Sequence, residues 1–409
     1  MSREREPQHR TKALIGHRIR WFLFILFFAV AGAVATPTVW GQAAGSVPDP
    51  IDDLVRREMA ARKLPSVALA VVKDGIIVKQ AAYGYARVSP DLAATPSTRY
   101  RLASVTKQFT AAAILILQQQ GRLRLEDSVR QYLVDAPASW ANITIRDLLT
   151  HTSGFPHDSP AGYGSLADQA SHPRDLLNRL YQIRPLTPPG THYQYSNAGY
   201  ALLGAIIETV SGQSYGQFLS QNIFAPAGMS DTRVDDENYS DPRLAMGYAW
   251  ESPLGRWQAR SQGYAPLAAG SVQSTVLDLA KWEAALETDA ILTAESKKQM
   301  WTPLVLKNGV EYDYGFAWLV QDTPAGPFIS HAGSGWGYST AFYRYPDAGY
   351  AIIVLTNLQP SKNNYHASVL ADAIASYYLS SPSSVAAKSS GQWAVASGQQ
   401  KQLSVVSGR

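Results

Sequence analysis

Apolar runs interrupted by turn residues mark β-strands at both ends of the chain. Residues 66–72 and 76–83 are strand-like, and Lys73-Asp-Gly75 between them is typical of a tight hairpin turn. Further strands are expected nearer the C-terminus, at residues 314–321, 327–331, 338–345 and 351–356. The turn sequence Pro346-Asp-Ala-Gly349 separates the last two. One sheet assembled from both ends of the chain is therefore the expected centre of the fold.

Helical patterns occupy most of the remaining chain. A helix rich in Ala, Leu and Gln is expected over residues 104–119, with Gly121 as its stop. Between about residues 123 and 262 helical patches alternate with loops rich in Pro and Gly, and strand signals are sparse. The clearest of the other helices are residues 51–62, 144–150, 198–210, 214–222, 275–286 and 366–379. The pattern predicts an α/β (α+β) fold with helices on the faces of the sheet and a mostly helical second lobe inserted at about 123–262.

Charge and composition limit the classes of function. The chain has 409 residues and 46% hydrophobic content, so it can bury a large core. The net charge of +4 arises from residues 1–20, which carry six Lys and Arg against two Glu, whereas the rest of the chain carries 30 residues of each sign. No nucleic-acid partner is therefore expected.

The N-terminal segment predicts export. A basic stretch precedes the apolar run at residues 21–35, and small residues suited to processing follow near Ala35 and Ala43. We interpret residues 1–43 as a secretory signal peptide; the alternative is an uncleaved membrane anchor, the only expected contact with a membrane. The absence of cysteine excludes disulfides, a lipidated Cys and a catalytic thiol. A periplasmic or secreted protein is expected, with its main domain at 44–380 and a disordered tail at 381–409.

One serine and one lysine have the spacing of a nucleophile and its base. The pattern S-x-x-K occurs once, at Ser104 and Lys107, where the expected helix begins. Residues three apart share a helix face, so the amine of Lys107 would lie beside the hydroxyl of Ser104. Unpaired N–H groups at a helix start favour a carbonyl oxygen that gains negative charge. The competing interpretation is a helix-capping serine followed by a solvated lysine.

Two further motifs follow along the chain. The pattern Y-x-N also occurs once, at Tyr195-Ser-Asn197, in a loop before a helix. His331-Ala-Gly333 begins a glycine-rich stretch at the end of a predicted strand, and glycine there suits close approach of backbone and ligand. Taken singly, these motifs are equally consistent with a buried tyrosine, a helix-capping asparagine and a structural histidine.

Together the motifs S-x-x-K, Y-x-N and [K/H]-x-G resemble, in this order, the serine β-lactamase and penicillin-binding-protein family, in its class C β-lactamase-related branch. Other matching segments are Arg101-Leu-Ala-Ser104, residues 148–154 (LLTHTSG), residues 269–275 and Thr356-Asn357. The resemblance covers about residues 51–379. It implies the β-lactamase/transpeptidase-like fold, an antiparallel sheet flanked by helices.

The resemblance also implies roles for particular residues. Ser104 would be the nucleophile that forms an acyl-enzyme, and Lys107 and Tyr195 would share its proton, with the choice of general base left open. Asn197 would orient the substrate or the lysine. The backbone N–H groups of Ser104 and Ser334 would form the oxyanion hole.

His331 stands where efficient β-lactamases of this family usually have a lysine, and it would contact substrate together with Gly333. Histidine is largely neutral near pH 7, which suits esters or D-amino-acid peptides better than the carboxylate of a penicillin. We therefore expect an esterase or D-aminopeptidase type of hydrolase. A true β-lactamase or D,D-carboxypeptidase is the alternative, and a non-catalytic relative that binds cell-wall peptides is a third.

No cofactor or metal is expected. The histidines outside the motifs lack the paired spacing of a helix-borne zinc site, and His151 is expected to make structural hydrogen bonds. The others are His157, His172 and His192. The expected partner is a small ester, D-peptide or β-lactam substrate, and the oligomeric state is left open.

Overall fold

The computed structural model describes residues 49–156, 173–235, 241–260, 267–323, 326–360 and 366–380. The predicted signal peptide and C-terminal tail lie outside these residues, as do His157 and His172. No helix among the described residues is long and apolar enough to cross a bilayer.

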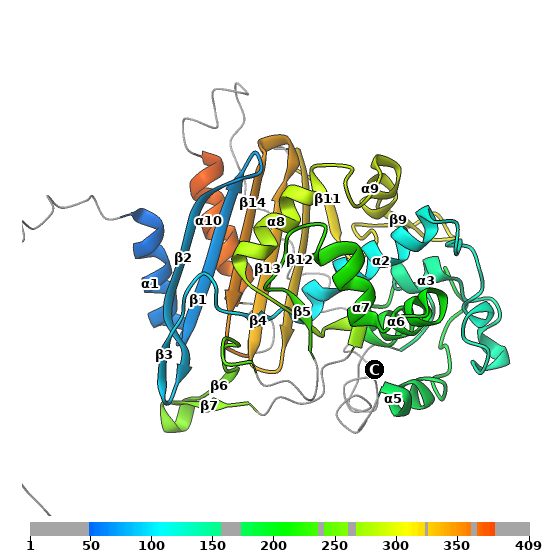
Figure 1. Cartoon of the computed structure of the whole chain (residues 1–409), viewed down its shortest axis with the longest axis horizontal. Coiled ribbons are helices and arrows are strands. Elements are labelled where there is room, and N and C mark those ends of the chain that lie inside the picture. The colour runs from blue at the N-terminus through cyan, green and yellow to red at the C-terminus, as the bar shows by residue number, and fades with distance from the viewer. Residues whose placement is uncertain are drawn as a thin grey trace, which may run out of the picture. The chain divides into compact units, whose positions relative to one another are not determined.

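An antiparallel sheet of seven strands is the centre of the described fold (Figure 1). Its order is β11-β12-β13-β14-β1-β2-β3, so strands from the two ends of the chain pair at β1 and β14, where Val67 faces Thr356. The prediction of one sheet built from both ends is confirmed. The strands are β1 (Ser66–Lys73), β2 (Ile76–Val88), β3 (Asp91–Ala93), β11 (Leu319–Thr323), β12 (Gly326–Gly335), β13 (Tyr338–Tyr345) and β14 (Tyr350–Thr356).

Alternation along β1 explains why this strand is apolar at nearly every position. Val67, Leu69 and Val71 belong to the core beneath α1 (Pro50–Arg62) and α10 (His366–Ser380). The residues between them belong to the core on the opposite face, with α8 (Val276–Leu286) and α2 (Lys107–Gln119). Side chains of a strand alternate between faces, so a central strand covered by helices on both faces must be apolar throughout.

The turn between β1 and β2 has the predicted geometry. Asp74 has φ 50° and Gly75 has φ 77°, so both central residues are left-handed, as a type I′ hairpin turn requires. Asp tolerates this region better than most residues and Gly adopts it freely.

A helical lobe lies beside the sheet, at the right of Figure 1. It contains α2, α6 (Asn197–Ser211) and shorter helices around them. The shorter ones are α3 (Ile145–Leu149), α5 (Pro173–Leu180), α7 (Tyr215–Leu219), a π-helical turn at Ser220–Phe224, α9 (Ala294–Met300) and the 3-10 turns η1 (Ala103–Thr106), η2 (Val129–Gln131) and η3 (Ala138–Trp140). Close packing of α2 against α6 joins the two segments that carry the S-x-x-K and Y-x-N motifs.

One strand prediction needs correction. The chain does not enter a strand at residue 314, because β11 begins only at Leu319 and Ala317 has φ 66°. A Cβ atom at Gly315 would lie 2.3 Å from the carbonyl oxygen of Met300, so the backbone passes very close to the end of α9.

Residues 123–262 also contain strands, since β6 (Tyr248–Glu251) and β7 (Arg256–Ala259) form a hairpin. Trp257 of β7 donates a hydrogen bond to Lys63 O at 2.7 Å, so this hairpin lies next to the C-terminal end of α1.

Short strands complete the described architecture. β4 (Tyr100–Arg101), β8 (Val272–Ser274) and β5 (Arg233–Val234) form a small sheet in the order β4-β8-β5. β9 (Leu304–Val305) pairs with β10 (Glu311–Tyr312). Because β4 leads directly into η1, the small sheet fixes the start of the turn that carries Ser104.

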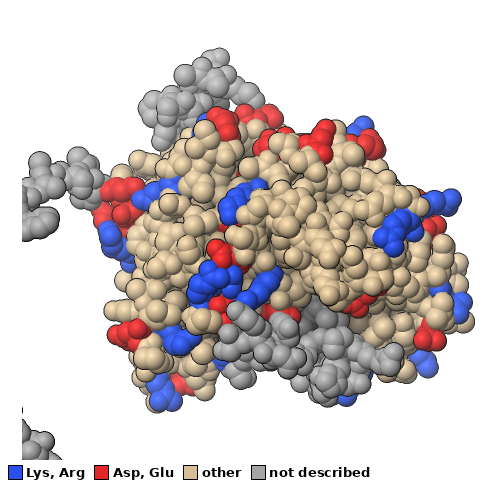
Figure 2. Space-filling view, viewed as in Figure 1, with Lys and Arg blue, Asp and Glu red and all other residues tan. Residues whose placement is uncertain are grey.

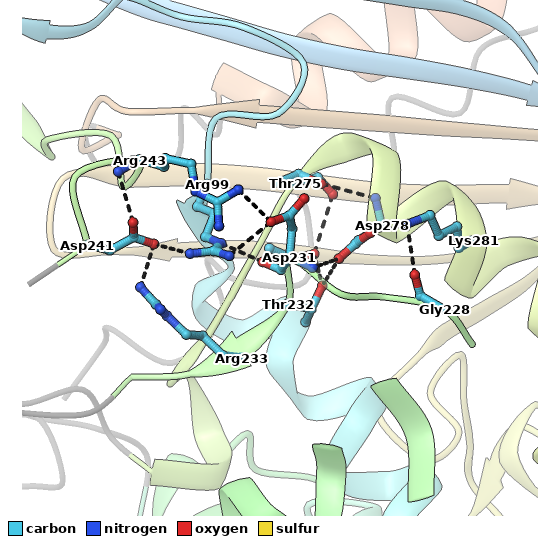
Figure 3. Close-up of polar contacts among 11 residues, drawn as sticks. Arg99, Gly228, Asp231, Thr232, Arg233, Asp241, Arg243, Thr275, Asp278 and Lys281 are labelled. Carbon is cyan, nitrogen blue, oxygen red and sulfur yellow. Dashed lines mark hydrogen bonds and ion pairs between the residues drawn. The ribbon is translucent and has the colours of Figure 1, made fainter. Parts of the chain in front are cut away.

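A largely buried ion network holds β4 in place (Figure 3). The guanidinium of Arg99, just before β4, pairs with the carboxylates of Asp231 at 3.0 Å and of Asp241. Arg233 pairs with Asp241 at 2.5 Å, and the backbone N–H of Arg243 donates to Asp241 at 2.9 Å. On the face of the molecule that Figure 2 shows, acidic and basic side chains lie near one another at several places among mostly uncharged residues.

Removal of one member of this network tests how much it stabilises the fold. The side chain of Asp241 is 1% exposed and that of Arg99 is 5% exposed. We expect Asp241→Ala to lower the free energy of unfolding by about 3 kcal/mol, because it leaves buried guanidinium groups without this carboxylate while Arg99 keeps Asp231. Urea denaturation followed by circular dichroism measures the change.

The control for this variant is Glu251→Ala. It breaks the pair with Arg256, whose side chain is 65% exposed, and should cost about 0–1 kcal/mol. Equal losses of unfolding free energy in the two variants would show that the network around Asp241 stabilises the fold no more than an exposed ion pair does.

Candidate active site

Ser104 lies on the 3-10 turn η1 and Lys107 is the first residue of α2. Residues i and i+3 eclipse each other in a 3-10 turn, so the two side chains are brought together. The amine of Lys107 donates a hydrogen bond to Ser104 Oγ at 3.0 Å. Lys107 is fully buried whereas Ser104 is partly exposed, so a substrate can reach the hydroxyl while the amine stays behind it.

The amine of Lys107 joins three segments of the chain. Besides Ser104 it donates to Asn197 Oδ1 at 2.6 Å, at the start of α6, and to Ala269 O at 2.8 Å. The rings of Tyr195 and Tyr200 lie over the amine, with centroids 4.9 and 5.5 Å away. The Y-x-N motif and the S-x-x-K motif therefore meet at one nitrogen.

Tyr195 is positioned by its neighbours in the loop before α6. Its ring packs at 4.3 Å from the ring of His151, and the next backbone N–H, that of Ser196, donates to His151 Nδ1 at 3.1 Å. His151 thus makes the structural hydrogen bonds that were predicted for it, and through them it fixes the segment that carries Tyr195 and Asn197.

The third motif runs past the nucleophile on strand β12. A side chain at Gly333 would lie 2.3 Å from Leu102 O, 2.4 Å from Thr340 Oγ1 and 3.1 Å from the backbone nitrogen of Ser104. Only glycine therefore lets β12 approach η1 this closely. Ser334 follows on the same strand and is partly exposed, near the partly exposed Ser104.

His331 lies in the same site but carries no charge. Burial lowers its pKa to about 3, and the charge of Lys107 acts in the same direction. One ring nitrogen, Nδ1, contacts Ala332 O at 2.7 Å, and the other, Nε2, contacts the hydroxyl of Tyr314 at 3.1 Å. Both nitrogens of this neutral imidazole therefore have partners within the protein.

Tyr314 is the residue of this site that sequence reasoning missed. It was expected inside a strand, but it lies in the irregular stretch before β11 and its hydroxyl contacts both His331 and His151. The only local signal was an aromatic run, Tyr312-Asp-Tyr314-Gly-Phe316, which is equally typical of core packing.

The described residues hold no group of three or more His, Asp or Glu side chains arranged to bind a metal ion. His192, one of the histidines considered for such a site, is exposed and contacts Thr191 at 2.9 Å.

Comparison with known proteins agrees with this fold and site. The protein-family model described as Beta-lactamase matches residues 51–375, so the chain belongs to the β-lactamase family. The predicted family and fold class are confirmed.

Individual relatives give the same assignment. Penicillin-binding protein 4* of Bacillus subtilis is 34% identical over 304 residues, which cover 70% of this chain and 66% of that protein. An unguisins hydrolase of Aspergillus campestris is 28% identical, over 77% of this chain and 63% of its own length. The chain therefore spans slightly less than two thirds of these relatives. A solved structure, the octameric penicillin-binding protein homologue from Pyrococcus abyssi, superposes with a TM-score of 0.71 at 29% identity, over 80% of this chain and 76% of that one.

The tight passage of β12 past η1 gives a test of the site. Gly333→Ala should lower kcat/KM for any hydrolysed ester by about 10² or more, because the added methyl group pushes the strand away from the amide of Ser104. Steady-state kinetics with p-nitrophenyl butyrate measure the effect.

The control for this variant lies on the same strand. A methyl group at Gly335 meets only Ala103 Cβ, at an ordinary 4.0 Å, so Gly335→Ala should retain activity near that of the wild type. Similar activities for the two variants would contradict the proposed closeness of Gly333 to the reaction centre.

Proposed function

We propose that this protein is an exported serine hydrolase that forms an acyl-enzyme on Ser104 and hydrolyses ester or amide bonds, as an esterase or D-amino-acid peptidase. The observation that carries the proposal is the buried amine of Lys107 at 3.0 Å from Ser104 Oγ. A base within hydrogen-bond distance of a hydroxyl, itself oriented by further groups, is the arrangement of an activated nucleophile.

The reaction would proceed in two steps. Ser104 Oγ attacks the substrate carbonyl while its proton passes either to Lys107, which acts in its neutral amine form and then accepts from Oγ, or to a deprotonated Tyr195. The same proton then goes to the leaving alcohol or amine. The backbone N–H groups of Ser104 and Ser334 donate to the carbonyl oxygen as it gains charge, a contribution of about 10²–10³ in rate for each donor. A water molecule then attacks the acyl-enzyme, and its proton returns along the same route to Ser104.

Either Lys107 or Tyr195 can act as the base in this scheme. The direct contact with Ser104 favours Lys107, and the ring of Tyr195 lies beside the same amine, with its centroid 4.9 Å away. The carbonyl oxygen of Asn197 accepts from Lys107 and so fixes the direction of the amine.

The neutral His331 supports a substrate without a carboxylate at this position. A fixed cation would attract the carboxylate of a penicillin, and an imidazole whose pKa is about 3 cannot do so at physiological pH. Among the relatives, the unguisins hydrolase is a hydrolase by name, which agrees with general hydrolytic activity.

A second candidate function is that of a β-lactamase or D,D-carboxypeptidase. The observation in its favour is the similarity to penicillin-binding protein 4* and to the penicillin-binding protein homologue from Pyrococcus abyssi. A non-catalytic role in binding cell-wall peptides has less support, because binding alone does not require Ser104, Lys107, Tyr195 and Asn197 to converge.

Export is the part of the proposal that rests on sequence alone. Residues 1–43 combine a basic stretch, an apolar run and small residues in the order of a secretory signal, and a periplasmic or secreted location follows if they act as one. The size of the protein recovered outside the cytoplasm distinguishes a cleaved signal from a membrane anchor.

Covalent labelling tests the proposed nucleophile. The mature protein is incubated with a fluorophosphonate probe and, in parallel, with a fluorescent penicillin, and the labelled peptide is mapped by mass spectrometry. We expect the label on Ser104, and we expect Ser104→Ala to lose both the label and at least about 10³ of p-nitrophenyl ester turnover while its circular dichroism is unchanged. Label elsewhere, or turnover by the alanine variant at the wild-type rate, would remove Ser104 from its role.

His331→Lys separates the two candidate functions. A cation at this position should raise the ratio of kcat/KM for nitrocefin to kcat/KM for a neutral ester by about tenfold, because a charge-assisted hydrogen bond to the β-lactam carboxylate is gained. A ratio that does not move in a variant with an unchanged melting temperature would show that residue 331 does not select substrate charge. Fast nitrocefin turnover by the wild type would instead support the β-lactamase assignment.

A further inference from the structure

The hairpin that joins β12 to β13 has an unusual residue at its tip. Its loop consists of two residues, Trp336 and Gly337, because Gly335 is already paired with β13. Their φ values are 48° and 90°, the left-handed pair of a type I′ turn. Such turns favour Asn, Asp or Gly at the first position, and the hairpin between β1 and β2 has Asp74 there. Tryptophan is strained in this conformation, which points to a use for its side chain that outweighs the strain.

Packing of the indole into a core does not supply that use. The structure describes seven tryptophans, and six of them lie in a hydrophobic core or pack against one. These six are Trp140, Trp250, Trp257, Trp282, Trp301 and Trp318. Trp336 is the exception, since it is partly exposed and belongs neither to the cores of the described residues nor to the side chains packed against them. Core packing therefore does not explain why tryptophan stands at a position that disfavours it.

The backbone of the turn is held in place by its neighbours. The N–H of Gly337 donates to Gln359 Oε1 at 2.8 Å. A Cβ atom at Gly247 would lie 2.4 Å from the carbonyl oxygen of Trp336, so another segment of backbone passes directly against the turn. The point from which the indole projects is therefore fixed, as recognition of a substrate by this side chain requires.

The turn lies at one end of the candidate active site. A Cβ atom at Gly335 would be 4.0 Å from the Cβ of Ala103, the residue before the nucleophile. The other end is marked by His331, whose ring lies 6.4 Å from that of Tyr195. A strand rises about 3.3 Å per residue, so the tip of the hairpin is roughly 15 Å from His331. Tyr195 is one of the two groups proposed to protonate the leaving group, so the leaving group belongs at that end and the acyl group extends toward Trp336.

We propose that Trp336 is a specificity-determining residue whose indole forms an apolar wall for the acyl group, and that the preferred substrates carry an aromatic group next to the scissile carbonyl. An aromatic ring packed on an indole gains more than its buried area alone provides. This inference rests on the proposed hydrolase function and adds to it the class of acyl group.

The experiment replaces Trp336 with asparagine, which a type I′ turn favours before glycine. The value of kcat/KM is measured with p-nitrophenyl phenylacetate and p-nitrophenyl acetate, which share a leaving group and differ in the acyl group. In Trp336→Asn the ratio of phenylacetate to acetate should fall by about tenfold, because the contact between the rings is lost. The melting temperature should rise by about 2–4 °C, because asparagine adopts the left-handed conformation with less strain.

Asp74→Asn is the matched control. It places asparagine at the same position of the other type I′ turn, where Asp74 already has φ 50°. The ratio of phenylacetate to acetate and the melting temperature should both stay at their wild-type values. A second pair of esters, p-nitrophenyl acetate and phenyl acetate, differs in the leaving group alone, and its ratio should not change in Trp336→Asn.

Three results overturn the inference while the labelling of Ser104 still supports the proposed function. They are an unchanged ratio of phenylacetate to acetate, a change confined to the pair that differs in leaving group, and a lower melting temperature of Trp336→Asn, which would assign Trp336 a packing role only. The melting temperature is read without turnover, so it tests the inference even if neither ester is hydrolysed. Absence of both turnover and label on Ser104 contradicts the proposed function, and the inference with it.

Discussion

The buried amine of Lys107 is the constraint on which the site depends. An amine that is removed from water must have its hydrogen bonds satisfied by the protein, because leaving them unmade is expensive. Here the partners are Ser104 Oγ, Asn197 Oδ1 and Ala269 O, from three segments that are distant in sequence. The contacts that satisfy the buried amine therefore also orient the nucleophile.

The surrounding elements can be understood from this requirement. The 3-10 turn η1 places Ser104 beside the amine, and α6 begins at Asn197, which contacts it. The 3-10 turn Leu267–Ala269, before β8, supplies the carbonyl of Ala269. Strand β12 then passes so close to η1 that only glycine fits at position 333. The ion network around Arg99 holds β4, which leads into η1, so a displacement of β4 would also displace Ser104.

The turns, strands and helix starts whose conformation is set by neighbouring residues were predictable from the sequence. The turn at Asp74-Gly75 requires left-handed residues and has them, and β13 has the bounds that its apolar run indicated. The helix after Thr275 begins with that residue as its cap, because the threonine hydroxyl accepts the N–H of Asp278 at 3.1 Å. The structure brings Ser104, Tyr195 and Asn197, which belong to the family motifs, close to the amine of Lys107.

What escaped prediction depends on contacts between distant segments. Tyr314 lacks a specific sequence signal because its place in the site depends on contacts with His151 and His331, which are 163 and 17 residues away along the chain. The hairpin β6–β7 was missed because a short two-stranded ribbon gains its stability from packing rather than from pattern, here through Trp257 and Lys63. The neutrality of His331 likewise follows from burial and from Lys107, neither of which its sequence neighbours reveal.

Several residues with a strained backbone conformation lie close to the candidate active site. Of the residues other than glycine that the structure describes with positive φ, Lys63 ends a helix and Asp74 lies in the hairpin turn. The others are Ala103 (48°), His151 (58°), Ala317 (66°) and Trp336 (48°). Ala103 precedes the nucleophile, His151 and Ala317 flank the hydrogen bonds of Tyr314, and Trp336 follows the strand that carries Ser334. Each such residue costs about 1–3 kcal/mol and persists only where the surrounding structure determines it completely. A sheet covered on both faces and a largely buried ion network are rigid enough to hold these conformations, and the site can therefore keep a geometry that its own residues would not adopt alone.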